Sequence, residues 1–112
     1  MENLTKRDNQ DAVGVLEVFG LVCAFMAADA GCKAANVRLE VFDKNKPANA
    51  DKLPVPLIVC IKFRGSVDSV TAAVEAAANA ANRLTGVVSS HIIANTESDT
   101  EYMLKLNAFD KK

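Results

Sequence analysis

The chain of 112 residues is the size of one compact domain. Half of its residues are apolar and 24% are charged, a balance typical of globular proteins. The net charge of −1 excludes the strongly basic surface of proteins that bind nucleic acid or anionic membranes, so neither partner is expected.

The beginning of the chain carries no targeting signal that we recognise. Residues 1–11 are polar, mixed in charge and without periodicity, unlike a signal peptide. No apolar run in the chain approaches the roughly 20 residues needed to cross a bilayer. We therefore expect a cytoplasmic protein in which residues 1–11 form a flexible N-terminal tail.

A strand over residues 12–18 is the first predicted element. Its apolar side chains leave almost no polar alternation, which favours a strand in the middle of a sheet or covered on both faces. Gly20 interrupts the pattern and allows a helix to begin close by. Residues 21–35 predict that helix, and its many alanines would let another backbone approach closely.

The predicted helix has an apolar face and an ion pair. The apolar side chains at helical spacing, which are expected to face the core, are Leu21, Val22, Phe25, Met26 and Ala28. Asp29 and Lys33 stand four residues apart in the order that favours an ion pair along the helix. Gly31 costs about 1 kcal/mol relative to alanine in a helix, and the sequence offers no reason for it.

Two alternating segments follow, at residues 37–42 and 57–64. Each has one apolar face and one partly charged face, which predicts an antiparallel pair of strands with one face toward the core. The charged side chains, which are expected to pair across the strands or to meet a neighbouring subunit, are Arg38, Glu40, Lys62 and Arg64.

The connection between these strands, residues 44–56, is the best local candidate for function. It is roughly twice the usual length of about 4–6 residues. It holds all three prolines of the chain and no glycine, so we expect it to be stiff. The candidate residues of this loop are Lys44, Asn45, Lys46, Pro47, Ala48, Asn49, Ala50, Asp51 and Lys52.

The second half of the chain repeats the pattern of helix and strand. Ser66 is a predicted N-cap of a second helix, which ends at Gly86. The predicted apolar face of that helix comprises Val67, Val70, Val74, Ala77, Ala81 and Leu84. A fourth strand is expected over residues 87–94 and a short helix over residues 97–106, followed by a tail at 107–112.

The order strand–helix–strand–strand–helix–strand, followed by a short helix, predicts an α+β fold. Right-handed crossover connections turn this order into a ferredoxin-like four-stranded antiparallel sheet. The two long helices are expected on one face of that sheet.

Catalytic and metal chemistry finds little support. Cys23, Cys32 and Cys60 form no Cys-x-x-Cys pair, and the first two lie on opposite faces of one predicted helix, so they cannot share a metal. They are expected to be buried small hydrophobes, with a redox or iron–sulfur role as the alternative. His91 is the only histidine, which excludes a His-rich metal site within one chain, and is expected to be a hydrogen-bonded strand residue. No catalytic residue, metal or cofactor is assigned, and the chain is not expected to be an enzyme.

Several short motifs resemble those of the hexameric shell proteins of bacterial microcompartments, the proteins with a BMC domain. The first block reads Ala-Val-Gly-Val-Leu-Glu at 12–17, Gly-Leu at 20–21, Ala-Ala-Asp-Ala at 27–30 and Lys-Ala-Ala-Asn-Val at 33–37. The second block is Arg-Gly-Ser-Val at 64–67 with its continuation to 76, and His-Ile-Ile at 91–93 matches the last strand. The likeness covers about residues 12–106, which we take as a single domain.

The resemblance implies a structural protein that forms a cyclic homohexamer. Such hexamers tile edge to edge with each other and with other shell hexamers, and small metabolites pass through a central pore. At the position of Lys33, the family places a lysine at the hexamer edge, packed against its counterpart on the next hexamer. The loop at the position of residues 44–56 lines the pore.

Two departures from the family pattern stand out. The pore loop of the family is short and rich in Gly and Ser, whereas residues 44–56 are long, stiff and charged. Where the family often has Pro-Arg after the last strand, with the arginine at the edge contact, this chain has Ala94 and Asn95.

The loop over residues 44–56 has no cysteine, so the iron–sulfur cluster of some relatives is not expected. Long loops of this kind resemble those of glycyl-radical or choline-type microcompartments.

A second resemblance gives the alternative function. PII-like signalling proteins share the strand order and the long loop between the second and third strands, and they are trimers that bind nucleotide between subunits. No recognisable phosphate-binding segment is present, which favours the shell protein. A small enzyme with a site between subunits ranks third.

Overall fold

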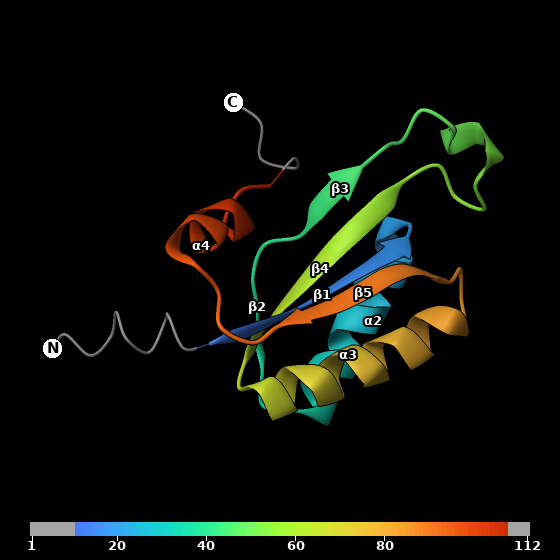
Figure 1. Ribbon diagram of the computed structural model, residues 1–112. Helices are drawn as coiled ribbons and strands as arrows, with labels where there is room; N and C mark the ends of the chain where they lie inside the picture. The colour runs from blue at the N-terminus through green and yellow to red at the C-terminus, as the bar shows by residue number, and fades with distance from the viewer. Residues whose placement is uncertain (1–10, 108–112) are drawn as a thin grey trace, which may run out of the picture.

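The computed structural model describes residues 11–107 (Figure 1). The expected tails at 1–11 and 107–112 therefore lie outside the described residues, apart from Asp11 and Asn107. In chain order the elements are β1 (Ala12–Phe19), α2 (Leu21–Ala34), β2 (Arg38–Leu39), β3 (Asp43–Asn45), the 3₁₀ turn η1 (Ala50–Lys52), β4 (Ile58–Gly65), α3 (Val67–Asn82), β5 (Val87–Ile93) and α4 (Ser98–Leu104).

One antiparallel sheet forms the centre of the fold, with strand order β2-β4-β1-β5 and β3 also paired with β4. Helices α2 and α3 lie side by side on one face of the sheet, and α4 lies on the other (Figure 1). The predicted ferredoxin-like arrangement and the short C-terminal helix are confirmed.

The edge strand is broken by a bulge that the sequence did not predict. Leu39 pairs with Phe63, and Asp43 pairs with Cys60. Between these two pairs, the edge strand has three residues where β4 has two. This extra residue is the signature of a β-bulge, which turns the side chains that follow it. Phe42 was expected on the charged face, but its ring instead lies 5.4 Å from that of Phe25 on α2. The prediction of one continuous strand over 37–42 is therefore wrong.

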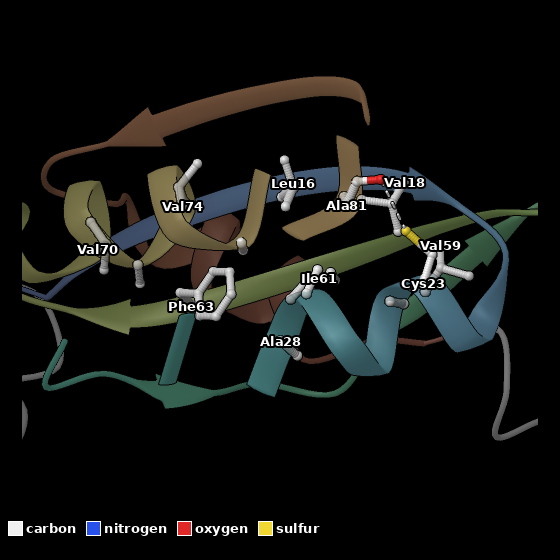
Figure 2. Close-up of a cluster of buried hydrophobic side chains, with 14 of the residues drawn as sticks. Leu16, Val18, Cys23, Ala28, Val59, Ile61, Phe63, Val70, Val74 and Ala81 are labelled. Atoms are coloured by element: carbon white, nitrogen blue, oxygen red, sulfur yellow. Dashed lines mark hydrogen bonds between the residues drawn. The ribbon is translucent and has the colours of Figure 1, made fainter. Parts of the chain in front are cut away.

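The core lies between the sheet and the two long helices (Figure 2). Val59, Ile61 and Phe63 alternate along β4 and are fully buried toward α2 and α3, as predicted. Leu16 and Val18 of the central strand β1 are also fully buried in this cluster. The apolar alternation of β4 thus identified the core face of the sheet correctly.

Helix α2 faces the core with the opposite side from the one predicted. Its buried residues are small, namely Cys23, Ala24, Ala27, Ala28 and Gly31. Val22, Phe25 and Met26 are 74%, 59% and 53% exposed, so of the predicted apolar face only Ala28 is buried. Small side chains let α2 pack closely against α3 and the sheet. A Cβ on Gly31 would lie 2.6 Å from the Phe63 ring, which explains the glycine.

Helix α3 follows its prediction except at its ends. The Ser66 Oγ accepts a hydrogen bond of 3.1 Å from the Ser69 N–H and caps the helix as expected. Its buried residues are Val70, Ala73, Val74, Ala77, Ala80 and Ala81. Val67 and Leu84 are exposed and do not join the core, because they lie at the first residue of the helix and beyond its last.

Candidate functional site

The candidate loop is shorter than predicted because its first residues extend the sheet. β3 pairs with β4 from Asp43 opposite Cys60 to Asn45 opposite Ile58. Lys44 and Asn45 are therefore strand residues, and the loop proper runs over 46–57. Of the predicted loop residues, Pro47 is half-buried, Ala50 is buried, and the exposed ones are Lys44, Asn45, Lys46, Ala48, Asn49, Asp51 and Lys52.

The tip of this loop is a hydrogen-bonded turn. The Ala50 N–H donates to the Pro47 carbonyl at 3.0 Å, and the Lys52 N–H donates to the Asn49 carbonyl at 2.9 Å. The Leu53 N–H donates to the Ala50 carbonyl at 3.1 Å and closes the 3₁₀ turn η1. Each of these bonds fixes local backbone geometry, which agrees with the expected stiffness.

The returning limb of the loop contacts the start of α2. The Gly20 N–H donates to the Leu57 carbonyl at 2.8 Å. Gly20 has a φ of +91°, and a Cβ there would lie 3.2 Å from Cγ1 of Val55. A glycine is therefore needed where strand, helix and loop meet. The loop projects beyond the sheet at this end of the molecule (Figure 1).

The two candidate edge residues lie at the opposite end of the sheet. α2 runs back along β1, and its 14 residues span about 20 Å, so Lys33 is far from the loop. Val13, near the start of β1, pairs with Ile93, which precedes the exposed Asn95 by two residues. Lys33 and Asn95 therefore share one end of the sheet, and the loop occupies the other.

The predicted ion pair along α2 is present. The Lys33 Nζ lies 2.8 Å from Oδ2 of Asp29, and both side chains are largely exposed. The hydrogen bond to Asp29, and then its negative charge, raise the pKa of Lys33. The Lys33 ammonium thus stays charged and reaches solvent.

The charged face of β4 is buried, which the sequence did not predict. Lys62 and Arg64 are only 4% and 1% exposed. The Lys62 Nζ donates to the carbonyls of Leu104 and Leu106 at 2.8 and 3.0 Å, and Arg64 forms an ion pair with Glu101. The expected cross-strand or intersubunit pairing is wrong for these two residues, because α4 covers them.

Glu101 is the carboxylate at the centre of this contact. Burial alone would raise the pKa of Glu101, but the hydrogen bonds from Thr96 and Arg64 and the charges of Arg64 and Lys105 outweigh it. The pKa of Glu101 therefore lies below its usual value. On the neighbouring strand β2, Nη2 of Arg38 lies 2.5 Å from Oδ2 of Asp11.

A small cavity of about 170 Å³ lies at the base of the loop and includes Glu17, Asp43 and Cys60 in its lining. The pKa of Cys60 is raised to about 11, chiefly because its thiol is buried. The positive charge of Lys62 lowers this pKa, and the negative charges of Glu17 and Asp43 raise it. A protonated thiol is a poor nucleophile and a poor metal ligand. Within residues 11–107, no group of three or more His, Cys, Asp or Glu side chains is arranged to hold a metal ion.

The remaining candidates for redox or catalytic chemistry are Cys23, Cys32 and His91. Cys23 is buried, and its Sγ donates to the Ala81 carbonyl at 3.9 Å (Figure 2). Cys32 is half-buried, and burial followed by the Asp29 charge raises the pKa of its thiol. The prediction of buried cysteines is confirmed fully only for Cys23. His91 is exposed on the edge strand β5.

Comparison with known proteins shows the family to which this chain belongs. Residues 12–96 match the BMC domain family, and the chain belongs to that family. It is 36% identical to the bacterial microcompartment shell protein PduA of Salmonella typhimurium over 95 residues, covering 85% of this chain and 92% of PduA. It is 37% identical to the carboxysome shell protein CcmK2 of a Synechocystis species over 97 residues, covering 85% of each chain.

Further comparisons agree with this assignment. The major carboxysome shell protein CsoS1A of Halothiobacillus neapolitanus is 39% identical over 94 residues, covering 83% of this chain and 87% of CsoS1A. A crystal structure of a microcompartment protein from Desulfitobacterium hafniense has a TM-score of 0.66 at 24% identity. The match covers 88% of this chain and about half, 49%, of that one, and it supports the fold alone.

The predicted family is therefore confirmed, and with it a structural rather than catalytic role. The relatives are shell proteins, so the PII-like alternative is not favoured. Among the helices that the structure describes, none is both long enough and apolar enough to span a membrane.

Proposed function

We propose that the chain forms cyclic hexamers that tile, with one another and with other shell hexamers, into the wall of a cytoplasmic microcompartment. Membership of the BMC domain family supports a shell role. The observation that carries the finer proposal is the separation of the loop from Lys33 and Asn95 at opposite ends of the sheet. A tiling ring needs one end of each subunit near its axis and the other at its rim.

At the axis, the loop over 46–57 would surround the pore. Around a six-fold axis, each copy contributes the exposed charges of Lys44, Lys46, Asp51 and Lys52. The 3₁₀ turn and the extended β3–β4 pairing support a stiff collar that narrows the opening. Small polar metabolites would pass this collar, with selectivity set by its width and by its rings of charge.

At the rim, Lys33 would pack against its counterpart on the next hexamer, with Asn95 beside this contact. The largely exposed Lys33 ammonium and its distance from the loop support this role. The same lysine also pairs with Asp29, so the edge role and the pairing along the helix must be separated by experiment.

Light scattering of the purified protein tests the ring, and electron microscopy tests the tiling. We expect six times the chain mass of 11.9 kDa for the wild type. Lys33→Ala should keep that mass but lose extended sheets. Asp29→Asn is the matched control, because it removes the ion pair along α2 and keeps the lysine, so its sheets should persist.

Two outcomes would contradict this proposal. Normal sheets formed by Lys33→Ala would remove Lys33 from the edge. A mass of three chains would return the PII-like trimer to consideration and call for nucleotide titration.

A further inference from the structure

The segment after β5 covers two buried cations but buries little apolar surface. We call residues 96–107, which include α4, the α4 segment. Helix α4 has no buried residue, and its side chains Tyr102 and Met103 are largely exposed. Apolar burial is the dominant favourable term in folding. The α4 segment is therefore held on the sheet mainly by polar contacts.

These polar contacts centre on Lys62 and Arg64 of β4. The Lys62 Nζ donates to the carbonyls of Leu104 and Leu106, at the last residue of α4 and just beyond it. Carbonyls at a helix end have no partner within the helix, so the Lys62 ammonium both caps α4 and anchors it. A helix of seven residues is marginally stable without such contacts. Release of α4 from the sheet and its unwinding should therefore occur together.

The guanidinium of Arg64 is only partly satisfied beneath the α4 segment. Its Nη2 donates to Oε2 of Glu101, but its Nε and Nη1 are buried without a hydrogen-bond partner among residues 11–107. A buried donor without a partner costs free energy, and this cost favours opening of the cover. A guanidinium can also bind one carboxylate through two parallel hydrogen bonds, whereas Glu101 engages a single nitrogen.

We propose that the α4 segment is a reversible cover over a carboxylate-binding site formed by Lys62 and Arg64. In the closed state, Glu101 occupies Arg64 and the α4 carbonyls occupy Lys62. Opening presents both cations to solvent on the face of the sheet opposite α2 and α3 (Figure 1). The ligand is an acidic segment of a partner protein, whose carboxylates complement both charges and bind Arg64 through two nitrogens.

The spacing of the two cations favours a peptide over a single small anion. Lys62 and Arg64 are two residues apart on β4 and meet the same segment, so they stand about 7 Å apart on one face of the strand. An anion of the size of acetate does not reach both charges at that distance, whereas two carboxylates of one acidic peptide do. Complementary charges also steer such a partner toward the site.

Acylation of Lys62 in the full chain measures the opening. Because Lys62 is buried, an amine reagent reaches its Nζ only when the cover opens. We expect its protection factor, from peptide mass spectrometry, to be at least about tenfold smaller than that of the β1 amides in hydrogen exchange. Glu101→Gln removes the charge that holds Arg64 and should lower the Lys62 protection factor about fivefold. Asp99→Asn removes an exposed carboxylate from the same helix and should leave it unchanged.

Titration calorimetry with hexaglutamate measures binding. Glu101→Gln should bind this peptide about fivefold more tightly than the wild type, because the closed state withholds the site in proportion to its population. Asp99→Asn changes the net charge equally and should bind like the wild type. Adding Arg64→Gln to Glu101→Gln should weaken binding at least about tenfold. Adding Arg83→Gln instead removes an exposed arginine at the end of α3 and should retain binding.

Three outcomes would overturn this inference. Equal protection of Lys62 and the β1 amides would mean that Lys62 is exposed only when the whole domain unfolds. Equal affinities of Glu101→Gln and Asp99→Asn for hexaglutamate would reduce the gain to a general effect of charge. Binding that survives Arg64→Gln would take place on another surface.

Circular dichroism confirms that each variant is folded. If Arg64→Gln does not fold, Arg64→Lys gives the same test, because an ammonium keeps the charge but cannot form the two parallel hydrogen bonds. Acylation and peptide binding report on a single chain, so their failure leaves the proposed hexamer to be judged by light scattering.

Discussion

The two faces of the sheet are buried by different means. On the helix side, Val59, Ile61 and Phe63 of β4 are fully buried by apolar packing. On the other side, Lys62 and Arg64 are almost as deeply buried, but through hydrogen bonds and an ion pair to the α4 segment. The same strand thus supports an apolar core and a polar contact, and the two should respond differently to substitution.

Phe63→Ala should have the largest effect, because the ring is fully buried and packs against Gly31. Removing it leaves a cavity in the core, and we expect the free energy of unfolding to fall by about 3–5 kcal/mol. Urea unfolding at fixed protein concentration measures this loss. Tyr102→Ala removes an exposed ring and should change the free energy by less than about 0.5 kcal/mol. Equal losses in the two variants would contradict the assigned core.

Gly31→Ala tests the same contact from the helix. The added Cβ would lie 2.6 Å from the Phe63 ring and 3.0 Å from the Ala73 carbonyl oxygen. Overpacking of this kind costs about 1–3 kcal/mol, although alanine is the better helix former. Adding Phe63→Leu should recover part of the loss, because a smaller side chain makes room. Strictly additive effects of the two substitutions would show that the contact is absent.

Glu101 offers a test of the polar face through pH. Because its pKa is lowered in the folded protein, the charged carboxylate stabilises the fold at neutral pH. That stability is present above the unfolded pKa of about 4.3 and disappears as the pH falls through the folded value. The α4 contact should therefore weaken below about pH 4, as judged by hydrogen exchange of the α4 amides.

Glu101→Gln separates this effect from general acid unfolding. It keeps an acceptor for Arg64 but removes the charge, which should cost roughly 1 kcal/mol at pH 7. The acid-dependent loss of α4 protection should then be smaller than in the wild type. Asp99→Asn removes an exposed carboxylate from the same helix and should retain the wild-type profile. An unchanged profile in Glu101→Gln would place the acid sensitivity elsewhere.

The sequence predicted the parts of the fold that depend on neighbouring residues. Alternation along β4 identified its core face, and Ser66 identified the start of α3. The burial of Lys62 and Arg64 could not be predicted from that pattern, because it depends on distant residues of the α4 segment. Arg64 pairs with Glu101, which lies 37 residues later, and Lys62 donates to the carbonyls of Leu104 and Leu106. The bulge before Asp43 was not predicted either, because one extra residue does not change the strand propensity of the segment.

For the candidate site too, the sequence predicted some features and only the structure could show the others. Family motifs pointed to the loop and Lys33, and their placement at opposite ends of the sheet required the structure. The orientation of α2 was predicted wrongly because large apolar side chains were assumed to face the core. In α2, alanines and Gly31 fill the narrow space against α3 and Phe63, and Phe25 is left outside.

A matched pair of valines gives the finest test of that orientation. Val70 on α3 is fully buried, whereas Val22 on α2 is largely exposed. For subunits kept dissociated at low concentration, Val70→Ala should lower the unfolding free energy by about 1.5–3 kcal/mol. Val22→Ala should change it by less than about 0.5 kcal/mol. If Val22→Ala nevertheless raises the protein concentration needed for assembly, its side chain stabilises the contact between subunits. If it destabilises the subunit as much as Val70→Ala, then α2 packs with the face that its sequence first suggested.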